Sequence, residues 1–155
     1  MTNASVVTTV ILIRHAERQN PGSTKPDPRL NAAGKARAKK LIHVIGPSGV
    51  KAIYHSHFAR SRETARPLAT HLELSPIVMD EPPQIKSDIL SHHGGQTVLV
   101  VGHSDTIPDL INRLGAGSVP AIDDNEFDNL FIVKVFGQQS ASVTRLKYGN
   151  PSSVG

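Results

Sequence analysis

Two arginines and two histidines in this sequence have the side chains needed to hold an anion and attack it. Arg14 and His15 are adjacent, while Arg60 and His103 lie far along the chain. Two guanidinium groups can grip a phosphate through paired hydrogen bonds and neutralise its charge. One imidazole can attack phosphorus, and the other can donate a hydrogen bond to one of its oxygens. The four side chains could therefore transfer a phosphoryl group, provided that the fold brings them together.

Each of these groups follows a short apolar run. The runs cover residues 6–13, 51–56 and 97–101, and the first is rich in valine and isoleucine. Short apolar runs that end in polar residues are typical of buried parallel strands. The carboxyl ends of parallel strands share one edge of a sheet, where open α/β sheets place their ligand sites. We therefore expect the four side chains to converge at that edge.

The segment after the first strand predicts a loop and then a helix. Residues 19–30 contain three prolines and a glycine, and this loop is long enough to form a rim or lid over the strand end. Asn31 can cap a helix in which apolar residues recur at helical spacing up to Ile45. Gly46 and Pro47 then close that helix.

The middle of the chain predicts further short elements. Residues 56–65 form a loop that leads into a helix, and Pro67 should start a new helical turn that runs to Leu72, because proline cannot continue a helix. A short third strand is expected at residues 77–79. A brief helix at residues 85–90 follows a break that contains two prolines.

The last third of the chain predicts a helix and a hairpin. Pro108 suits the first position of a helix that Gly115 closes. Residues 130–136 and 142–147 are two further strands, close enough in sequence to pair as a hairpin. Residues 150–155 are expected to be a frayed tail.

Strands that alternate with helices predict an α/β fold. Such a chain forms βαβ units and a mainly parallel sheet with helices on both faces, which makes a three-layer sandwich. The hairpin near the end requires at least one late strand to run antiparallel. The sequence has 155 residues and contains no internal repeat and no long linker, so we expect one domain over residues 1–155.

The composition excludes some classes of protein and of site. Without cysteine, the 155 residues can form neither a disulfide framework nor a thiolate zinc site. The start of the chain does not resemble a signal peptide, and no apolar run approaches the length of a membrane span. We therefore expect a cytoplasmic protein without a membrane association.

The net charge of +4 favours anionic ligands. Nucleic acid is not expected among them, because a basic stripe interleaved with aromatic residues is missing. Lys35, Lys39 and Lys40 are better explained as the solvated face of a helix.

Eight histidines raise the question of a metal site. One residue separates His55 from His57, and His92 and His93 are adjacent. No carboxylate or cysteine stands at a matching ligand spacing, so these pairs are expected to be ordinary surface or strand-end residues. We expect neither a metal nor another cofactor.

Three motifs follow one another along the chain. They are Arg14-His15-Ala16-Glu17, Ser56-x-x-x-Arg60 with Thr64-Ala65 after it, and Val101-Gly102-His103-Ser104. In this order they resemble the histidine phosphatase (phosphoglycerate mutase-like) superfamily. The resemblance runs from Val10 to about Val135 and includes a segment at residues 27–38 that is similar to the family's "DP-x-L-x-x-x-G-x-x-R-A".

This resemblance implies a metal-independent phosphatase with a phosphoglycerate mutase-like fold. His15 would be the nucleophile that becomes transiently phosphorylated, and Arg14, Arg60 and His103 would complete the phosphate-binding pocket. The chain is similar in size to the small bacterial phosphohistidine phosphatases, and the long insert of larger members is missing. An open site of this kind suits a phosphorylated small molecule or a phosphoprotein.

The general acid of the family is the part that this sequence does not match. Many members supply a Glu or Asp, between the second arginine and the second histidine, that protonates the leaving group. The candidates here are Asp80, Glu81 and Asp88 in that interval and Asp105 after it. Glu81 is favoured, because Pro82 would hold its loop at the end of a strand.

Two alternatives to a phosphatase remain. A non-catalytic domain that binds phosphate or a phosphoprotein would keep the same pocket, although simple binding does not need the nucleophile His15. A phosphoglycerate mutase-type phosphotransferase would need further residues to hold and reorient a second phosphorylated ligand.

Overall fold

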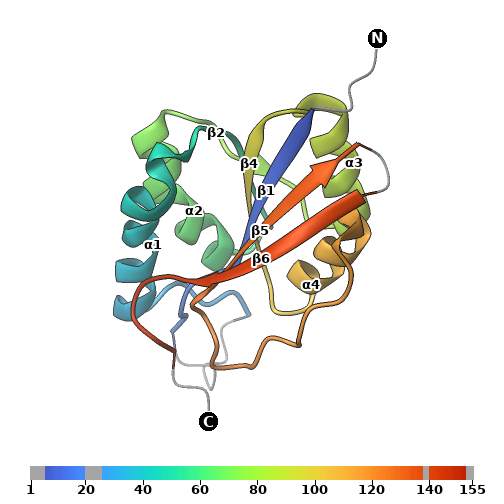
Figure 1. Ribbon diagram of the computed structural model, residues 1–155. Helices are drawn as coiled ribbons and strands as arrows, with labels where there is room; N and C mark the ends of the chain where they lie inside the picture. Colours follow the sequence, from blue (N-terminus) through green and yellow to red (C-terminus); the bar gives the residue numbers. More distant parts are fainter. Residues whose placement is uncertain (1–5, 20–25, 138–139, 153–155) are drawn as a thin grey trace.

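The computed structural model describes residues 6–19, 26–137 and 140–152. Its strands form one six-stranded sheet in the order β3-β2-β4-β1-β5-β6 (Figure 1). The strands are β1 (Val7–Arg14), β2 (Val50–His55), β3 (Ile77–Val78), β4 (Thr97–Gly102), β5 (Asn129–Phe136) and β6 (Ser140–Lys147). The helices are α1 (Ala32–Ile45), α2 (Ala59–Leu72), α3 (Pro82–His92) and α4 (Thr106–Ile111), with a 3₁₀ turn at Gly46–Ser48 and a π-helical turn at Asn112–Ala116.

The centre of the sheet is parallel. β1 pairs with β4, β4 with β2, and β2 with β3, and all four run in the same direction. Their carboxyl ends therefore lie at one edge, as expected. β5 is antiparallel to β1 and to β6, which confirms both the hairpin and the predicted antiparallel late strand.

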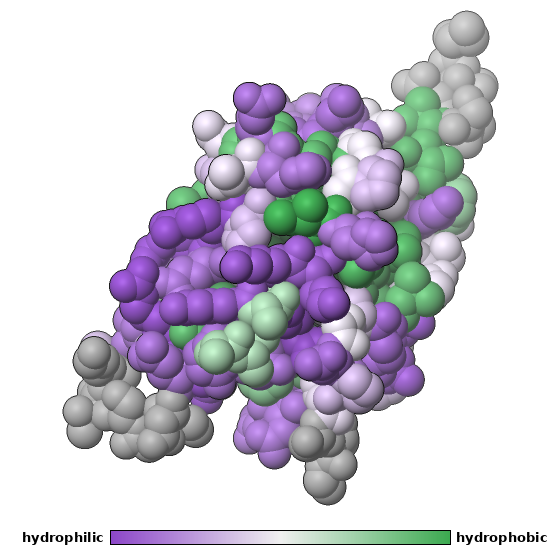
Figure 2. Space-filling model, turned by 90° about the vertical axis from the view of Figure 1, so that its left-hand side faces the viewer, coloured by the Kyte–Doolittle hydropathy of each residue, from purple (hydrophilic) through white to green (hydrophobic). Residues whose placement is uncertain are grey.

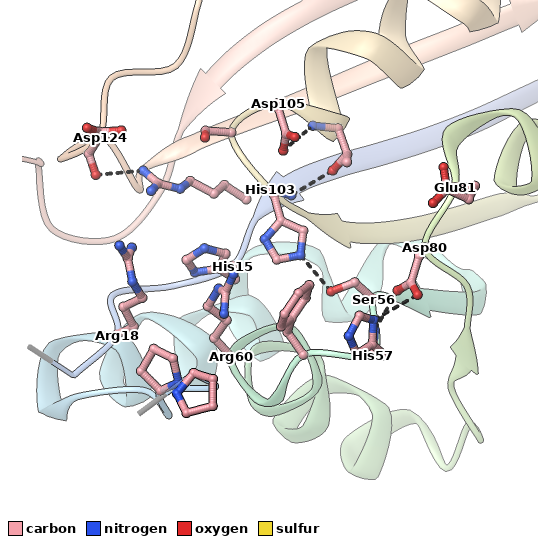
Figure 3. A pocket seen from close by; sticks show the side chains of 16 residues that line it. His15, Arg18, Ser56, His57, Arg60, Asp80, Glu81, His103, Asp105 and Asp124 are labelled. Carbon is pink, nitrogen blue, oxygen red and sulfur yellow. Dashed lines mark hydrogen bonds and ion pairs between the residues drawn. The ribbon is translucent and has the colours of Figure 1, made fainter. Parts of the chain in front are cut away.

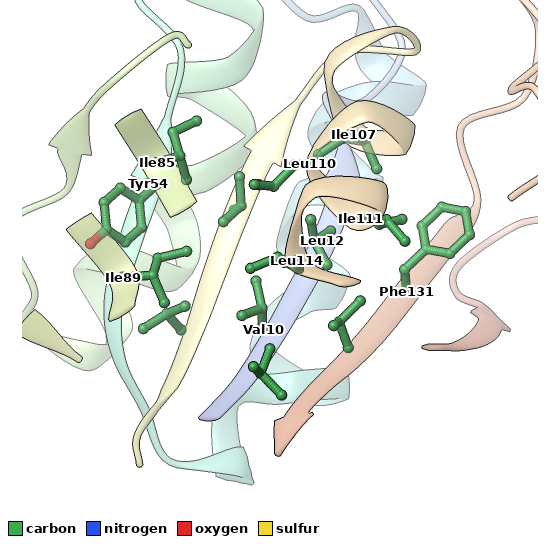
Figure 4. Close-up of a cluster of buried hydrophobic side chains, with 14 of the residues drawn as sticks. Val10, Leu12, Tyr54, Ile85, Ile89, Ile107, Leu110, Ile111, Leu114 and Phe131 are labelled. Carbon is green, nitrogen blue, oxygen red and sulfur yellow. The ribbon is translucent and has the colours of Figure 1, made fainter. Parts of the chain in front are cut away.

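Helices cover both faces of the sheet, which confirms the three-layer α/β prediction (Figure 1). Successive side chains of a strand point to opposite faces. Val10 and Leu12 of β1 accordingly join Ile107 of α4 in one core, drawn in Figure 4. Ile11 and Ile13 join the core on the α1 and α2 side. Because both faces of β1 are buried, its apolar run is nearly continuous.

The start of α1 confirms the predicted cap and fixes the chain that follows β1. The side-chain oxygen of Asn31 accepts a hydrogen bond from the backbone N–H of Gly34 at 2.9 Å. A Cβ atom on Gly34 would lie 2.0 Å from the carbonyl oxygen of Glu17. Only glycine therefore allows α1 to pack this closely on the segment just beyond His15.

The prediction for Pro67 was wrong. α2 continues through this proline as one helix from Ala59 to Leu72. A proline inside a helix removes one hydrogen bond and adds a clash, at a cost of about 3 kcal/mol. Buried residues on both sides of it, Ala65 and Leu68 among them, anchor the helix to the sheet, and their burial offsets that cost.

Two other helix boundaries differ from the prediction. α3 begins at Pro82 rather than at residue 85, because both prolines of the expected break occupy the first turn, where their missing N–H groups have no helical partner anyway. Pro108 is the third rather than the first residue of α4, since Asp105 caps that helix and accepts a hydrogen bond from Thr106.

The C-terminal segment is held in place as far as the structure describes it, contrary to the expected frayed tail. Arg37 donates to the carbonyl oxygen of Asn150, and the Ser152 hydroxyl accepts from the backbone N–H of Phe127. The loop at residues 19–30 lies only partly within the described residues, and a backbone bridge between Arg18 and Leu30 closes its base. Among the described helices, none has the length and apolar character to cross a membrane.

Candidate active site

The four residues predicted from the sequence line one cavity of about 740 Å³. The cavity lies beyond the carboxyl ends of β1, β2 and β4, so the parallel pairing of these strands brings together side chains that are up to 89 positions apart in the chain. Figure 3 shows His15, Arg60 and His103 close together in this cavity. The imidazole rings of His15 and His103 are 5.2 Å apart, edge to face.

The His15 ring is held in a single orientation. Its side chain is buried, and its backbone N–H donates to the carbonyl oxygen of Gly102 at 2.8 Å. The Nδ1 atom lies 2.8 Å from the carbonyl oxygen of Ala16. Because a carbonyl can only accept, this contact requires the hydrogen on Nδ1. The lone pair of the neutral ring is then on Nε2, the atom that can act as a nucleophile.

Burial lowers the pKa of His15 from 6.5 to about 3, and the positive charges of Arg14 and Arg60 act in the same direction. A buried imidazole without a carboxylate partner resists protonation because the charged form loses its hydration. His15 is therefore neutral throughout the physiological pH range. This is the protonation state that attack on phosphorus needs.

The backbone, rather than a carboxylate, holds the guanidinium of Arg14. Its Nη1 atom donates to the carbonyl oxygens of Asp123, Asp124 and Glu126 at 3.0–3.1 Å. The guanidinium lies over the ring of Phe127, 4.1 Å from its centre. Carbonyl dipoles orient the group without cancelling its charge, which remains available to an anion. Burial, followed by the charge of the nearby Arg18, lowers its pKa to about 10.

Arg60 lies on the first turn of α2 and also keeps its charge. Its guanidinium packs over the Phe58 ring at 4.3 Å, and its nearest carboxylate oxygen belongs to Asp27, at 4.0 Å. The same Asp27 oxygen accepts a hydrogen bond from the backbone N–H of Ala59, so this carboxylate also caps α2. The buried Nε atoms of Arg14 and Arg60 have no hydrogen-bond partner among the described residues.

Two serines fix the ring of His103, and the sequence analysis did not foresee this role. Nε2 of His103 lies 2.7 Å from the hydroxyl of Ser56, which is itself 2.8 Å from the hydroxyl of Ser61. Both serines are buried. In the sequence, Ser56 stands out only by its spacing to Arg60, and the helical pattern gives no signal for Ser61. Burial, followed by the charge of Arg60, lowers the pKa of His103 to about 4.

Two of the candidate acids are engaged in other contacts. Asp80 lines the cavity, but its carboxylate accepts hydrogen bonds from the backbone N–H and Nδ1 of His57, both at 2.8 Å. These bonds act against the effect of partial burial and lower its pKa. Asp88 lies away from the cavity and accepts a hydrogen bond from the hydroxyl of Tyr54.

The other candidate acids lie at the rim of the cavity. Glu81 is exposed and lines it, and among the described residues its carboxylate has no hydrogen-bond partner. Asp105 also lines the cavity, with one oxygen held by the N–H of Thr106. Asp124 is a further carboxylate at the cavity that sequence reasoning missed, because it follows no strand and lies far from the motifs.

The paired histidines do not form part of a metal-binding cluster in the described residues, where no three His, Cys, Asp or Glu side chains are placed to hold an ion. His55 is buried, with Nδ1 against the carbonyl of Ser56, and His57 pairs with Asp80. His92 is the last residue of α3 and His93 follows it; both lie outside the cavity, where they contact Asp88 and Gln96, respectively.

Glu17 completes the first motif but does not line the cavity. It forms two hydrogen bonds of 2.9 Å to the guanidinium of Arg37 on α1. Arg37 also donates to the carbonyl oxygens of Tyr148 and Asn150, so it connects the chain after β1 to the C-terminal segment. The end of the first motif is thus structural.

Comparisons with known proteins agree with the predicted resemblance. The family model of the histidine phosphatase superfamily (branch 1) matches residues 10–81. This segment begins within β1, includes Arg14, His15 and Arg60, and ends before His103. The resemblance drawn from the motifs is therefore confirmed. No curated protein matches the chain.

Solved structures confirm the phosphoglycerate mutase-like fold. The protein histidine phosphatase SixA in complex with tungstate is 15% identical, with a TM-score of 0.74 over 90% of this chain and 96% of that one. The α-ribazole phosphatase of Shigella flexneri is 16% identical, with a TM-score of 0.73 over 90% and 96%. The mycobacterial glucosyl-3-phosphoglycerate phosphatase is 15% identical, with a TM-score of 0.67 over 92% and 98%.

Proposed function

We propose that this chain is a metal-independent phosphatase of the histidine phosphatase superfamily, acting on a phosphate monoester or a phosphohistidine. The observation that carries this proposal is the environment of His15. Its ring is neutral, Nδ1 is tied to a backbone carbonyl, and it shares a cavity with two guanidinium groups. Among the described residues, neither guanidinium contacts a carboxylate more closely than 4.0 Å. A pocket with uncompensated positive charge beside a neutral nucleophile suits the attack on a phosphate dianion.

In the first step, the Nε2 lone pair of His15 forms a bond to phosphorus. The bond from phosphorus to the leaving group breaks, and its electron pair departs with that group, which takes up a proton. Arg14 and Arg60 hold the non-bridging oxygens, whose charge they balance throughout the transfer. His103 donates a hydrogen bond to one of these oxygens.

In the second step, water attacks the phosphorus of phosphohistidine. The P–N bond breaks, its electron pair returns to Nε2, and the proton of the water leaves with the released phosphate. His15 is again neutral because its low pKa disfavours the imidazolium. The same pocket thus serves both steps without a metal ion or another cofactor.

The leaving group decides whether an acid is needed. An alkoxide needs a proton as the P–O bond breaks, and a positioned acid typically contributes about 10²–10⁴-fold. Imidazole and phenolate leave more readily. For an alkyl phosphate we propose Glu81 as the acid, supported by its place on the cavity and its lack of a hydrogen-bond partner within the described part of the chain. Without such an acid, phosphohistidine and aryl phosphates are the better substrates.

Both a phosphoprotein and a phosphorylated small molecule are compatible with this pocket. The proteins of the same fold include one described as a protein histidine phosphatase and one described as an α-ribazole phosphatase. The SixA structure contains tungstate, an oxyanion with the charge and shape of phosphate. It supports an oxyanion site in this fold but does not choose between the two substrate classes.

Hydrolysis of p-nitrophenyl phosphate in the presence of EDTA tests the proposal. We expect turnover, competitive inhibition by vanadate, and a labelled phosphoenzyme that is stable in alkali and labile in acid. His15→Gln should form no phosphoenzyme, whereas His93→Gln, a matched control outside the cavity, should form it as the parent does. Binding of vanadate without any turnover would point to a non-catalytic phosphate-binding domain. Activity that EDTA abolishes and a divalent ion restores would contradict the metal-independent mechanism.

A further inference from the structure

A second cavity of about 390 Å³ lies between α1 and α2. Most of its polar rim is positively charged. The cations that line it are Arg29, Lys35, Lys39 and Arg66, and its one carboxylate is Glu63. Figure 2 faces the side of the molecule that carries α1 and α2, where hydrophilic side chains predominate. We refer to this cavity as the α1–α2 groove.

Three cations of the α1–α2 groove have no compensating carboxylate. Glu63 is paired with Arg29 and accepts the backbone N–H of Leu30. Within the part of the chain that the structure describes, Lys35, Lys39 and Arg66 form no ion pair. Lys35 and Lys39 are one helical turn apart on α1, so they face the same side. The groove therefore carries positive charge that its own side chains do not neutralise.

The floor of the α1–α2 groove is apolar. Leu30 and Ala38 are almost completely buried and line it together with the half-buried Pro67. No aromatic residue contributes to the lining. Single-stranded nucleic acid uses stacking on aromatic side chains, which this groove cannot provide. An apolar floor with a basic rim instead matches a protein segment that combines leucine-like side chains with aspartate or glutamate.

The α1–α2 groove is next to the active-site cavity. Arg18 and Pro28 line the active-site cavity, whereas their chain neighbours Gln19 and Arg29 line the groove. These two short segments pair, since the backbone N–H of Gln19 donates to the carbonyl of Arg29 at 2.7 Å. A single pair of chain segments thus separates the two cavities. The part of a bound partner that extends beyond the groove therefore lies at the mouth of the catalytic pocket.

From this juxtaposition we propose that the α1–α2 groove docks an acidic, amphipathic segment of a phosphoprotein substrate. The docking assigns a macromolecular substrate to the phosphatase and so rests on the proposed function. Charge attraction over the groove accelerates the encounter and orients the partner, while the half-buried Pro67 and the aliphatic parts of the basic side chains contribute apolar contact area. A small phosphate ester is too short to reach the groove and gains nothing from it.

Binding of a short fluorescent peptide of alternating glutamate and leucine tests the docking surface directly. The double variant Lys35→Glu/Lys39→Glu should raise its dissociation constant at least about tenfold, and rising salt should weaken binding to the parent protein. Lys40→Glu/Lys51→Glu is the matched control, because both lysines are exposed and outside the groove. This control should change the dissociation constant less than about threefold.

Kinetics then connect the groove to catalysis. The same peptide carrying a phosphohistidine should show a KM that rises at least about tenfold in the groove variant, while p-nitrophenyl phosphate keeps its kcat/KM. Equal effects of the two double variants, or binding of a lysine–leucine peptide as tight as that of the acidic one, would overturn the proposal. Binding of an oligothymidylate through these lysines without binding of the acidic peptide would also overturn it. Hydrolysis of p-nitrophenyl phosphate by the parent tests the phosphatase itself, so the two proposals can fail separately.

Discussion

Arg14 and Arg37 are similarly buried, at 5% and 4% exposed, but they have opposite environments. Arg37 forms a two-pronged ion pair with Glu17, which raises its pKa despite burial, and it also donates to two carbonyls. Among the described residues, Arg14 has only backbone carbonyls as hydrogen-bond partners, and burial lowers its pKa to about 10. One arginine is satisfied within the protein. The other keeps charge that an incoming anion can use.

The difference extends to the whole region around each arginine. Each of the three guanidinium nitrogens of Arg37 donates a hydrogen bond, and these bonds connect α1, the chain after β1 and the C-terminal segment. In the catalytic pocket, the Nε atoms of Arg14 and Arg60 have no partner within the described residues, and both histidines have lowered pKa values. A buried donor without a partner costs about 1–3 kcal/mol. The unpaired donors of the pocket therefore lower the free energy of unfolding but are available to bind an anion. Substitutions in the pocket should mainly change activity, and substitutions around Arg37 should mainly change stability.

The largest expected effect is that of His15→Ala on turnover. Removing the nucleophile should lower kcat by about 10⁴-fold or more on any substrate. The free energy of unfolding should be unchanged or slightly higher, because the ring is a buried polar group at a strand end. Steady-state kinetics and urea unfolding of the same preparation measure the two effects. Residual activity within about tenfold of the parent would remove His15 from the mechanism.

Arg60→Met should separate binding from stability. The loss of one guanidinium should lower kcat/KM by about 10²–10³-fold, because a positioned charge on the transferring group is missing. Stability should change little, since the nearest carboxylate is 4.0 Å from Arg60 and that carboxylate has the N–H of Ala59 as a second partner. Vanadate affinity provides an independent measure and should fall in parallel. A loss of stability as large as the loss of activity would contradict the contrast with Arg37.

Arg37→Met should show the reverse pattern. It leaves Glu17 half-buried without its partner, which should lower the free energy of unfolding by about 2–3 kcal/mol. The kcat/KM of the folded fraction should stay within about threefold of the parent, because the residue does not line the pocket. In the double variant Glu17→Gln/Arg37→Met the loss should be smaller, since no unpaired charge remains. A double variant that is no more stable than Arg37→Met would show that the unpaired charge of Glu17 does not lower the free energy of unfolding.

Ser56→Ala should have a smaller effect inside the pocket. Without the hydroxyl, the His103 ring can turn, and kcat should fall about tenfold with KM nearly unchanged. Ser56→Thr keeps a hydroxyl and should restore most of the rate, which a purely structural role of Ser56 would not predict. Equal kcat values for the alanine and threonine variants would exclude the hydroxyl as the positioning group.

The smallest expected change is the response of kcat/KM to mild acid. His15 and His103 have pKa values of about 3 and about 4, so after correction for substrate ionisation kcat/KM should stay level from pH 7 to about pH 5. Stability should behave differently. Between about pH 6.5 and 4 the unfolded chain binds protons at both histidines and the folded protein does not. The free energy of unfolding should therefore decrease as the pH is lowered through this range. His15→Gln should reduce that slope. A decline of activity centred at pH 6.5 would contradict the lowered pKa values.

The fold could be predicted from the sequence where an element is specified by neighbouring residues, through a run or a regular spacing of apolar side chains or through a capping residue. The apolar run of β1 and the cap at Asn31 follow from neighbouring residues, so both could be predicted. It failed at Pro67 because packing on the sheet, which the local pattern does not show, outweighs the local cost of a proline.

The candidate site divides in the same way. Arg14, His15, Arg60 and His103 could be placed together because strand ends of a parallel sheet meet. The contact of Arg14 with the carbonyls of residues 123–126 bridges more than a hundred positions and follows from no motif. The link from Ser56 to His103 depends on the pairing of β2 with β4 and on the orientation of the two side chains beyond these strands. Such contacts set protonation and orientation, and they could not be predicted from spacing alone.

The strand order also bears on biosynthesis. β1 leaves the ribosome first, yet its two neighbours in the sheet are β4 and β5, which are made much later. Until residue 97 and beyond have emerged, the backbone of this apolar strand has no sheet partner, and pairing over such distances in sequence is slow. We therefore expect the nascent chain to depend on chaperones that shield β1. Ribosome-bound chains that end before residue 123 should be inactive, because the carbonyls that orient Arg14 have not yet been synthesised.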